Sequence, residues 1–287
     1  MAEFPVPARL AARCGKTPEI AAWAKSLPGM VAELQARWRL QLGAPYEHEV
    51  SCAWVAPATR QDGTKAALKL GFPHMEAEEE IEGLRFWDGE PTAQLLEADK
   101  ELNALLLERC EPGTPLRTLP EPEQDVVLAG LLRRLWRVPT SPHPFRPLAE
   151  MTAYWAEESL EAAATWPDAG LARQGLRLFA DLPRSAPAQV LLATDLHAGN
   201  VLCAQRQPWL VIDPKPFVGD PAYDLTQHLL NCIGRLEADA RGFIRRMAEL
   251  CEVDAERVRL WCFARLAAEA GWSDWPARAA LALALAP

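Results

Sequence analysis

The pattern of the chain changes once, at residues 108–113, and this change constrains the fold more than any other feature. Before it, short apolar runs with strand character alternate with turns; after it, long stretches with helical periodicity dominate. We therefore expect an α+β fold with a small N-terminal lobe built on an antiparallel sheet (1–107), a connecting segment (108–113) and a larger, mainly helical lobe (114–287). A chain of 287 residues, 49% of them hydrophobic, is long enough to form both cores.

The N-terminal part mixes helix and strand signals. Pro28 interrupts a helical pattern, and because proline removes a backbone hydrogen bond from a helix, the pattern predicts two short helices. The run 103–108 is apolar almost throughout, which is typical of a central strand. The expected elements are two short helices within 18–42, a hairpin formed by 46–56 and 66–70, a glutamate-rich helix at about 75–88, and strands at 93–97 and 103–108.

Composition excludes several classes of protein. The formal net charge is −9, and no block of Lys and Arg is present, so the chain lacks the cations that a nucleic-acid binder needs. No stretch approaches the roughly 20 apolar residues of a membrane-spanning helix, and the start of the chain has no secretory signal pattern, so we expect a cytoplasmic protein without a membrane partner. The seven cysteines are scattered singly, which indicates buried thiols rather than disulfides or a zinc site.

The strongest local signal is a set of three oxygen-bearing side chains. An apolar run delivers Asp195 into a polar loop that ends at Asn200, and a second apolar run delivers Asp213 thirteen residues later. Phosphoryl transfer from a magnesium nucleotide needs such a set: one carboxylate to orient the acceptor hydroxyl, and an amide oxygen and a carboxylate on the metal. Either aspartate alone is more simply a turn cap. The combined spacing favours the catalytic interpretation.

The pattern D-x-x-x-x-N followed by I-D-P resembles the aminoglycoside phosphotransferase family, which has a protein-kinase-like fold. The nearest branch contains streptomycin 6-kinases and hydroxyurea phosphotransferases, and the resemblance covers roughly residues 45–275. It implies that Asp195 is the catalytic base and that Asn200 and Asp213 bind Mg²⁺.

The loop departs from the family at one point. Ala193 and Thr194 stand where the family usually has His-Gly, a change that we expect to affect the rigidity of the loop more than its chemistry. We interpret His197 as a structural or substrate-contacting residue. Asp220 is expected to cap a helix that begins with proline, and we expect both Asp220 and Asp224 to brace the catalytic loop.

A lysine in an apolar run predicts a second part of the site. Lys69 is costly to bury without a partner, and a helix carrying five glutamates follows it. At about 100° per residue, Glu80 lies closest to the centre of the apolar stripe of that helix, so we expect Lys69 to pair with Glu80. By the resemblance, this pair holds the α- and β-phosphates of ATP. The remaining glutamates are Glu76, which is next to the stripe, and Glu78, Glu79 and Glu82, which are expected to face solvent.

The connecting segment resembles the adenine-binding hinge of the same fold. By this match the Glu108 carbonyl and the Cys110 amide contact the base. The turn near residues 48–54 contains no glycine, so no glycine-rich phosphate loop is visible; Ser51 with nearby backbone amides is our candidate for that contact.

The resemblance implies an ATP- and Mg²⁺-dependent phosphotransferase acting on a hydroxyl of a small molecule. The expected acceptors are an aminoglycoside, such as streptomycin at its 6-hydroxyl, or hydroxyurea. Two alternatives stay open: a kinase for a metabolite such as choline, homoserine or a sugar, and a nucleotide-binding pseudokinase. We expect a monomer or weak dimer with a small-molecule substrate.

Overall fold

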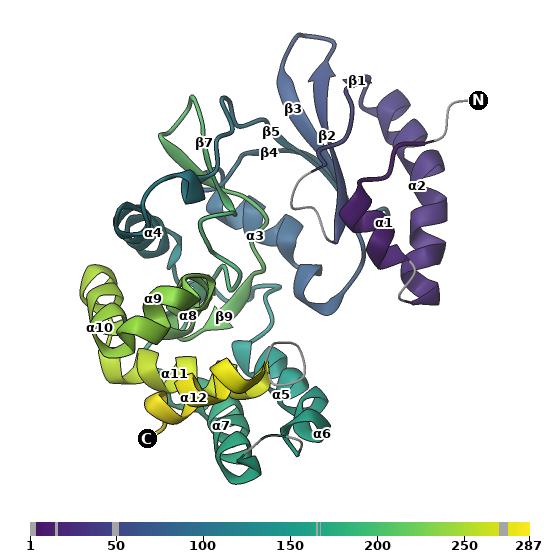
Figure 1. Cartoon of the computed structure of the whole chain (residues 1–287). Helices are drawn as coiled ribbons and strands as arrows, with labels where there is room; N and C mark the ends of the chain where they lie inside the picture. Colours follow the sequence, from purple (N-terminus) through teal and green to yellow (C-terminus); the bar gives the residue numbers. More distant parts are fainter. Residues whose placement is uncertain (1–3, 15–16, 48–51, 165, 167, 270–274) are drawn as a thin grey trace. The chain divides into compact units, whose positions relative to one another are not determined.

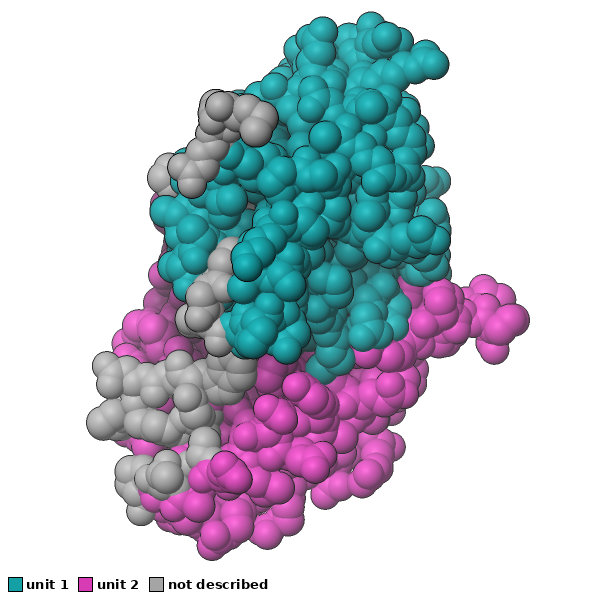
Figure 2. Space-filling view, turned by 90° about the vertical axis from the view of Figure 1, so that its right-hand side faces the viewer, with its two compact units in different colours: residues 1–113, 204–208 teal, residues 114–203, 209–287 magenta. Residues whose placement is uncertain are grey.

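The structure is a computed structural model of the chain (Figure 1). It describes residues 4–14, 17–47, 52–164, 166, 168–269 and 275–287. The chain forms two compact units, coloured separately in Figure 2: unit 1 comprises Met1–Gly113 and Ala204–Pro208, and unit 2 comprises Thr114–Cys203 and Trp209–Pro287. The expected boundaries place residues 204–208 in the helical lobe, whereas the structure groups them with unit 1.

Unit 1 is built on a five-stranded antiparallel sheet with the order β1-β2-β3-β5-β4. Strand β5 lies between two neighbours, as its apolar run predicts, and its residues 104–107 are all buried. Gly63, with φ +87°, occupies the turn between β2 and β3, where a left-handed backbone favours glycine. The strands are β1 (Leu40–Leu42), β2 (Ala53–Arg60), β3 (Lys65–Gly71), β4 (Leu95–Asp99) and β5 (Ala104–Glu108).

Helices cover both faces of this sheet (Figure 1). Helix α1 (Ala8–Cys14) and helix α2 (Pro18–Arg37) pack on one face, and helix α3 (Glu80–Trp87) follows the 3₁₀ turn η1 (Met75–Ala77) and packs on the other. The α+β prediction is confirmed, but the predicted break at Pro28 is wrong, because α2 continues through it. The buried side chains Trp23, Leu27, Val31 and Leu34 join the core on both sides of the proline, and their packing offsets the lost hydrogen bond.

Unit 2 is mainly helical and carries two short antiparallel ladders. Strand β6 (Val190–Leu192) pairs with β9 (Phe217–Gly219), and β7 (Val201–Cys203) pairs with β8 (Trp209–Val211). Helices α7 and α11 approach closely, since a Cβ atom on Gly175 would lie 2.4 Å from Cβ of Ala267. The helices are α4 (Glu121–Leu135), α5 (Leu148–Glu158), α6 (Leu160–Ala163), α7 (Ala169–Asp181), α8 (Pro221–Asn231), α9 (Ile233–Ala238), α10 (Ala240–Cys251), α11 (Ala255–Ala268) and α12 (Trp275–Leu285), with 3₁₀ turns η2 (Leu116–Thr118) and η3 (Leu182–Ser185).

Two sequence-based expectations about the whole chain can be compared with this fold. Across the described residues, none of the helices combines the length and apolar character needed to cross a bilayer. Cys232, Cys251 and Cys262 are buried thiols that form no disulfide, as predicted, whereas Cys52, Cys110 and Cys203 are free thiols that are only half-buried.

Candidate active site

The loop that follows β6 is held by one buried carboxylate. Asp224, on α8, accepts hydrogen bonds from the backbone N–H of Ala193 at 3.1 Å and of Thr194 at 2.7 Å. The indole Nε1 of Trp136 donates to the same carboxylate at 2.9 Å. Asp224 therefore braces the loop that carries Asp195, as expected from the sequence.

Thr194 is one of the two residues that replace His-Gly, and its geometry shows how this replacement affects the loop. Its φ is +46°, in the left-handed region where glycine is favoured and a β-branched residue is strained. The side-chain hydroxyl donates to the Lys215 carbonyl at 2.7 Å, a bond that glycine cannot make. This bond and the two that the loop N–H groups donate to Asp224 hold the Thr194 backbone in a conformation that is unfavourable for threonine.

Helix α8 begins as the sequence predicts. The Asp220 carboxylate caps it by accepting from the Ala222 N–H at 3.0 Å, and Pro221 occupies the first turn. The other partners of this carboxylate are Arg257 and Nε1 of Trp261, both on α11, so the expectation that Asp220 also braces the loop is wrong. Burial raises the pKa of Asp224 to about 6, against the opposing effect of its hydrogen bonds from Trp136 and the loop backbone. Asp224 is therefore mostly ionised at neutral pH.

The Asp195 side chain lies at the centre of this loop. Its Oδ1 accepts from Nε2 of Gln227 at 2.6 Å, and Asn200 Nδ2 donates to the Asp195 carbonyl at 3.0 Å. Gln227 is absent from the sequence-based candidates. Its position three residues after Asp224, on the same side of α8, is the only signal that could have pointed to it.

The charged groups around Asp195 have opposing effects on the pKa of its carboxyl group. Burial raises the pKa of the Asp195 carboxyl above its usual value; the Lys215 ammonium opposes this shift, and the Asp213 carboxylate adds to it. Burial also lowers the pKa of His197, whose Nδ1 accepts from the Gly199 N–H at 3.0 Å. His197 thus shapes the turn as a neutral imidazole.

Asn200 and Asp213 lie at the same end of the β7–β8 ladder, because the Ile212 N–H donates to the Asn200 carbonyl at 2.9 Å. Asp213 has φ +54°, and its Oδ1 pairs with Nζ of Lys215, a residue to which the sequence assigned no role in the site. Both side chains offer oxygen atoms, and Mg²⁺ prefers oxygen and takes few protein ligands when phosphates complete its shell. Within the described ranges, no three His, Cys, Asp or Glu side chains form a metal-binding group.

In unit 1 the predicted lysine–glutamate pair is present. Lys69 Nζ lies 2.5 Å from Oε1 and 2.6 Å from Oε2 of Glu80, and both side chains are buried. Because successive strand residues face opposite sides of the sheet, Lys69 faces the α3 side, opposite to Leu68 and Leu70. The expectation that Glu79 faces solvent is wrong: it is 9% exposed, because it precedes α3, where the 3₁₀ turn breaks the helical count.

The connecting segment begins at the end of β5. The Glu108 carboxylate accepts from the Gln94 N–H at 3.1 Å and from Nη2 of Arg206 at 2.8 Å, and the Glu108 N–H donates to the Gln94 carbonyl at 2.8 Å. The contact with the base that the resemblance implies involves the Glu108 carbonyl and stays a prediction. Cys110 follows in the same segment, next to the turn at Gly113. Ser51 lies outside the described residues.

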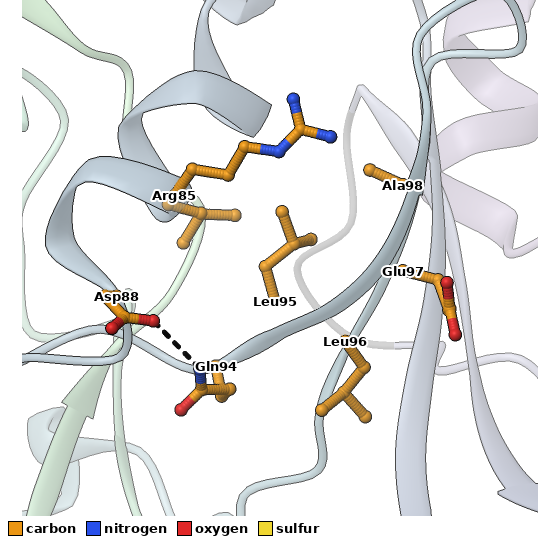
Figure 3. A pocket seen from close by; sticks show the side chains of 8 residues that line it. Arg85, Asp88, Gln94, Leu95, Leu96, Glu97 and Ala98 are labelled. Atoms are coloured by element: carbon orange, nitrogen blue, oxygen red, sulfur yellow. Dashed lines mark hydrogen bonds between the residues drawn. The ribbon is translucent and has the colours of Figure 1, made fainter.

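A pocket of about 320 Å³ lies in unit 1 between α3 and β4 (Figure 3). In Figure 3 the Arg85 side chain extends beside it, and Gln94 bonds to Asp88. None of the candidate site residues that the structure describes lines this pocket. Its lining consists of Leu84, Arg85, Asp88, Gln94, Leu95, Leu96, Glu97 and Ala98.

Comparison with known proteins gives consistent matches. The model of the family described as aminoglycoside/hydroxyurea antibiotic resistance kinase matches residues 37–275. The chain is 38% identical to a streptomycin 6-kinase of Streptomyces griseus, over 88% of this chain and 84% of that protein. It is 40% identical to a hydroxyurea phosphotransferase of Kitasatospora aureofaciens, over 86% of this chain and 73% of that protein. A choline kinase structure from Streptococcus pneumoniae aligns with a TM-score of 0.63 at 13% identity, covering 90% of this chain and 98% of that one, which shows a shared fold.

Proposed function

The chain belongs to the aminoglycoside/hydroxyurea antibiotic resistance kinase family and is a phosphotransferase, and from this we propose that it transfers the γ-phosphate of Mg²⁺-ATP to the 6-hydroxyl of streptomycin. The chain aligns with 84% of the streptomycin 6-kinase and 73% of the hydroxyurea phosphotransferase, which favours the first acceptor. Hydroxyurea is the second candidate, supported by the 40% identity to the latter protein.

The observation that carries this proposal is the arrangement of Asp195, Asn200 and Asp213 in one loop system of unit 2. Asp195 orients the acceptor hydroxyl and takes its proton, and burial raises its pKa, which makes the carboxylate a stronger base. Asn200 and Asp213 hold Mg²⁺, which supplies positive charge to the phosphate oxygens. The hydroxyl oxygen forms the new bond to phosphorus as the bond from phosphorus to the bridging oxygen of ADP breaks.

Residues of unit 1 bind the nucleotide in this proposal. Lys69 holds oxygens of the α- and β-phosphates, and Glu80 keeps the ammonium in place through the two short contacts described above. The Glu108 carbonyl and the Cys110 amide hold the adenine edge, and Ser51 contacts phosphate.

An ATP-consumption assay across acceptors tests the proposal. We expect turnover with streptomycin, dependence on Mg²⁺, and a product whose phosphate NMR assigns to the 6-hydroxyl. Turnover with hydroxyurea alone would favour the second candidate. Stimulation only by choline, homoserine or a sugar would make the protein a metabolite kinase and overturn the proposal, and Mg²⁺-ATP binding without turnover would indicate a pseudokinase.

A further inference from the structure

The Asp195 carboxylate has two hydrogen-bond donors among the described residues, and they are unequal. Gln227 Nε2 lies 2.6 Å from Oδ1, whereas Asn200 Nδ2 lies 3.5 Å from Oδ2, at the limit of a hydrogen bond. The bonds that Ala193 and Thr194 donate to Asp224 fix the backbone of the loop but leave the side-chain torsions of Asp195 free. The contact with Gln227 is therefore the one that fixes the direction of the carboxylate.

Gln227 is itself held on a firmly anchored helix. It lies three residues after Asp224, so one face of α8 contacts both the backbone and the side chain of the catalytic loop. Asp220 caps the start of α8. Near its end, the buried His228 Nε2 lies 2.9 Å from Oδ1 of the buried Asp125. An element fixed at both ends can hold a reacting group within the narrow tolerance that catalysis requires.

We propose that Gln227 is a positioning residue that turns Oδ1 of Asp195 away from the reaction and presents Oδ2 to the acceptor hydroxyl. This inference rests on the proposed function, in which Asp195 takes the hydroxyl proton. A side-chain amide suits this task because it donates a hydrogen bond and has no charge that titrates near neutral pH. The proton of the hydroxyl passes to Oδ2, while the Gln227 N–H stays on Oδ1 throughout the transfer.

The test is the substitution Gln227→Met, which keeps the length of the side chain and removes the donor. We expect kcat with Mg²⁺-ATP and streptomycin to fall about 10–100-fold, because misplacing a reacting group by about 1 Å can cost about 100-fold. KM for both substrates should change less than about twofold, and the thermal midpoint should be unchanged, since Gln227 contacts neither substrate in this proposal. Gln227→Glu is the second variant: its carboxylate opposes that of Asp195, so we expect kcat at or below that of Gln227→Met.

Asn231 provides a matched control on the same helix. Its Nδ2 donates to the Gln227 carbonyl at 2.8 Å, so Asn231→Ala removes an amide hydrogen bond one turn away without touching Asp195. We expect this variant to keep the wild-type kcat.

A double-variant cycle separates this inference from the proposed function. In an Asp195→Asn background, Gln227→Met should lower kcat no further, because it acts through the carboxylate that is already lost. Wild-type kcat in both Gln227→Met and Gln227→Glu would overturn the role of Gln227. So would a loss of kcat from Gln227→Met that is as large in the Asp195→Asn background as in the wild type. Neither result would contradict the assignment of the base. Wild-type kcat in Asp195→Asn would overturn the assignment of the base. If streptomycin is not phosphorylated, hydrolysis of Mg²⁺-ATP with water as acceptor gives the same comparison.

Discussion

At the scale of single residues, Thr194 combines a strained backbone with a hydrogen bond that compensates for the strain. Its hydroxyl is buried and donates to the Lys215 carbonyl, and this carbonyl belongs to the segment that follows Asp213. One side chain thus ties the segment of the proposed base to the segment of the proposed metal ligand.

Thr194→Val keeps the shape of this residue and removes the bond. We expect the free energy of unfolding to fall by about 1–3 kcal/mol, because the Lys215 carbonyl loses its buried partner. Urea denaturation measures the change, and Thr194→Ser, which retains the hydroxyl, is the control. Equal stability of the valine variant and the wild type would mean that the bond does not hold the loop.

The sequence predicts some of these residue-level features and not others. The Lys69–Glu80 pair could be predicted because a charge in an apolar strand needs a partner, and helical geometry selects among nearby glutamates. Gln227 has only its place three residues after Asp224 as a signal, because a glutamine on a helix has no chemical signature and its partner is 32 residues away. Lys215 was likewise missed, since a lysine two residues from an aspartate is common and its pairing depends on the loop conformation.

At the scale of elements, α8 and α4 are joined by a buried ionic cluster around Asp125. The Asp125 carboxylate has no exposure to solvent and accepts bonds from Arg235 at 2.9 and 3.0 Å and from Arg246 at 2.8 Å, in addition to its contact with His228. These hydrogen bonds outweigh the effect of burial and hold the pKa of Asp125 well below its usual range. The cluster fixes α8, and with it Asp224 and Gln227.

Asp125→Ala should lower the free energy of unfolding by about 3 kcal/mol, the lower end for a broken buried ion pair, because both guanidinium groups keep some contact with solvent. Chemical denaturation measures this loss. Glu123→Ala, an exposed position on the same helix, should change stability by about 0.5 kcal/mol or less. Similar effects of the two substitutions would contradict a structural role for the cluster.

Asp224 gives the stability a specific pH dependence. Its folded-state pKa of about 6 exceeds the ordinary aspartate pKa of 3.8, so between these values the folded protein binds more protons than the unfolded chain. The contribution of Asp224 to stability is therefore largest at low pH and is lost as the pH rises toward 6. We expect the difference in unfolding free energy between wild type and Asp224→Asn to be larger at pH 5 than at pH 7; a difference that grows with pH would contradict this sign.

Some helices and strands can be predicted from the local sequence, and others cannot. Strand β5 and the long helices follow from unbroken patterns, whereas the continuity of α2 through Pro28 depends on packing partners far away in sequence. The local sequence shows the helix propensity of a segment, but it does not show the tertiary packing that can override this propensity.

At the scale of the whole molecule, the division into units depends on contacts that no local pattern contains. Arg206 bonds to Glu108, 98 residues earlier, and to the carbonyls of Gly89 and Thr92 at 2.8 and 2.9 Å. Residues 204–208 therefore belong with unit 1, although the chain enters and leaves this segment from strands of unit 2.

The buried thiols of unit 2 report on its unfolding. Burial raises the pKa of Cys232, Cys251 and Cys262 to about 12, so almost none of each is thiolate at pH 8. We expect iodoacetamide to leave all three unmodified in the native protein and to alkylate them in urea, as peptide mass spectrometry can measure. Rapid alkylation under native conditions would show that unit 2 opens locally around these residues.

The placement of residues 204–208 determines how this kinase can be recombined with its relatives. A chimera joined at residue 113 would combine the first 113 residues of one protein with residues 204–208 of another. The contact between Glu108 and Arg206 would then depend on two residues from different proteins. The exchangeable module is discontinuous, and a transplant of unit 1 between family members must include both of its segments.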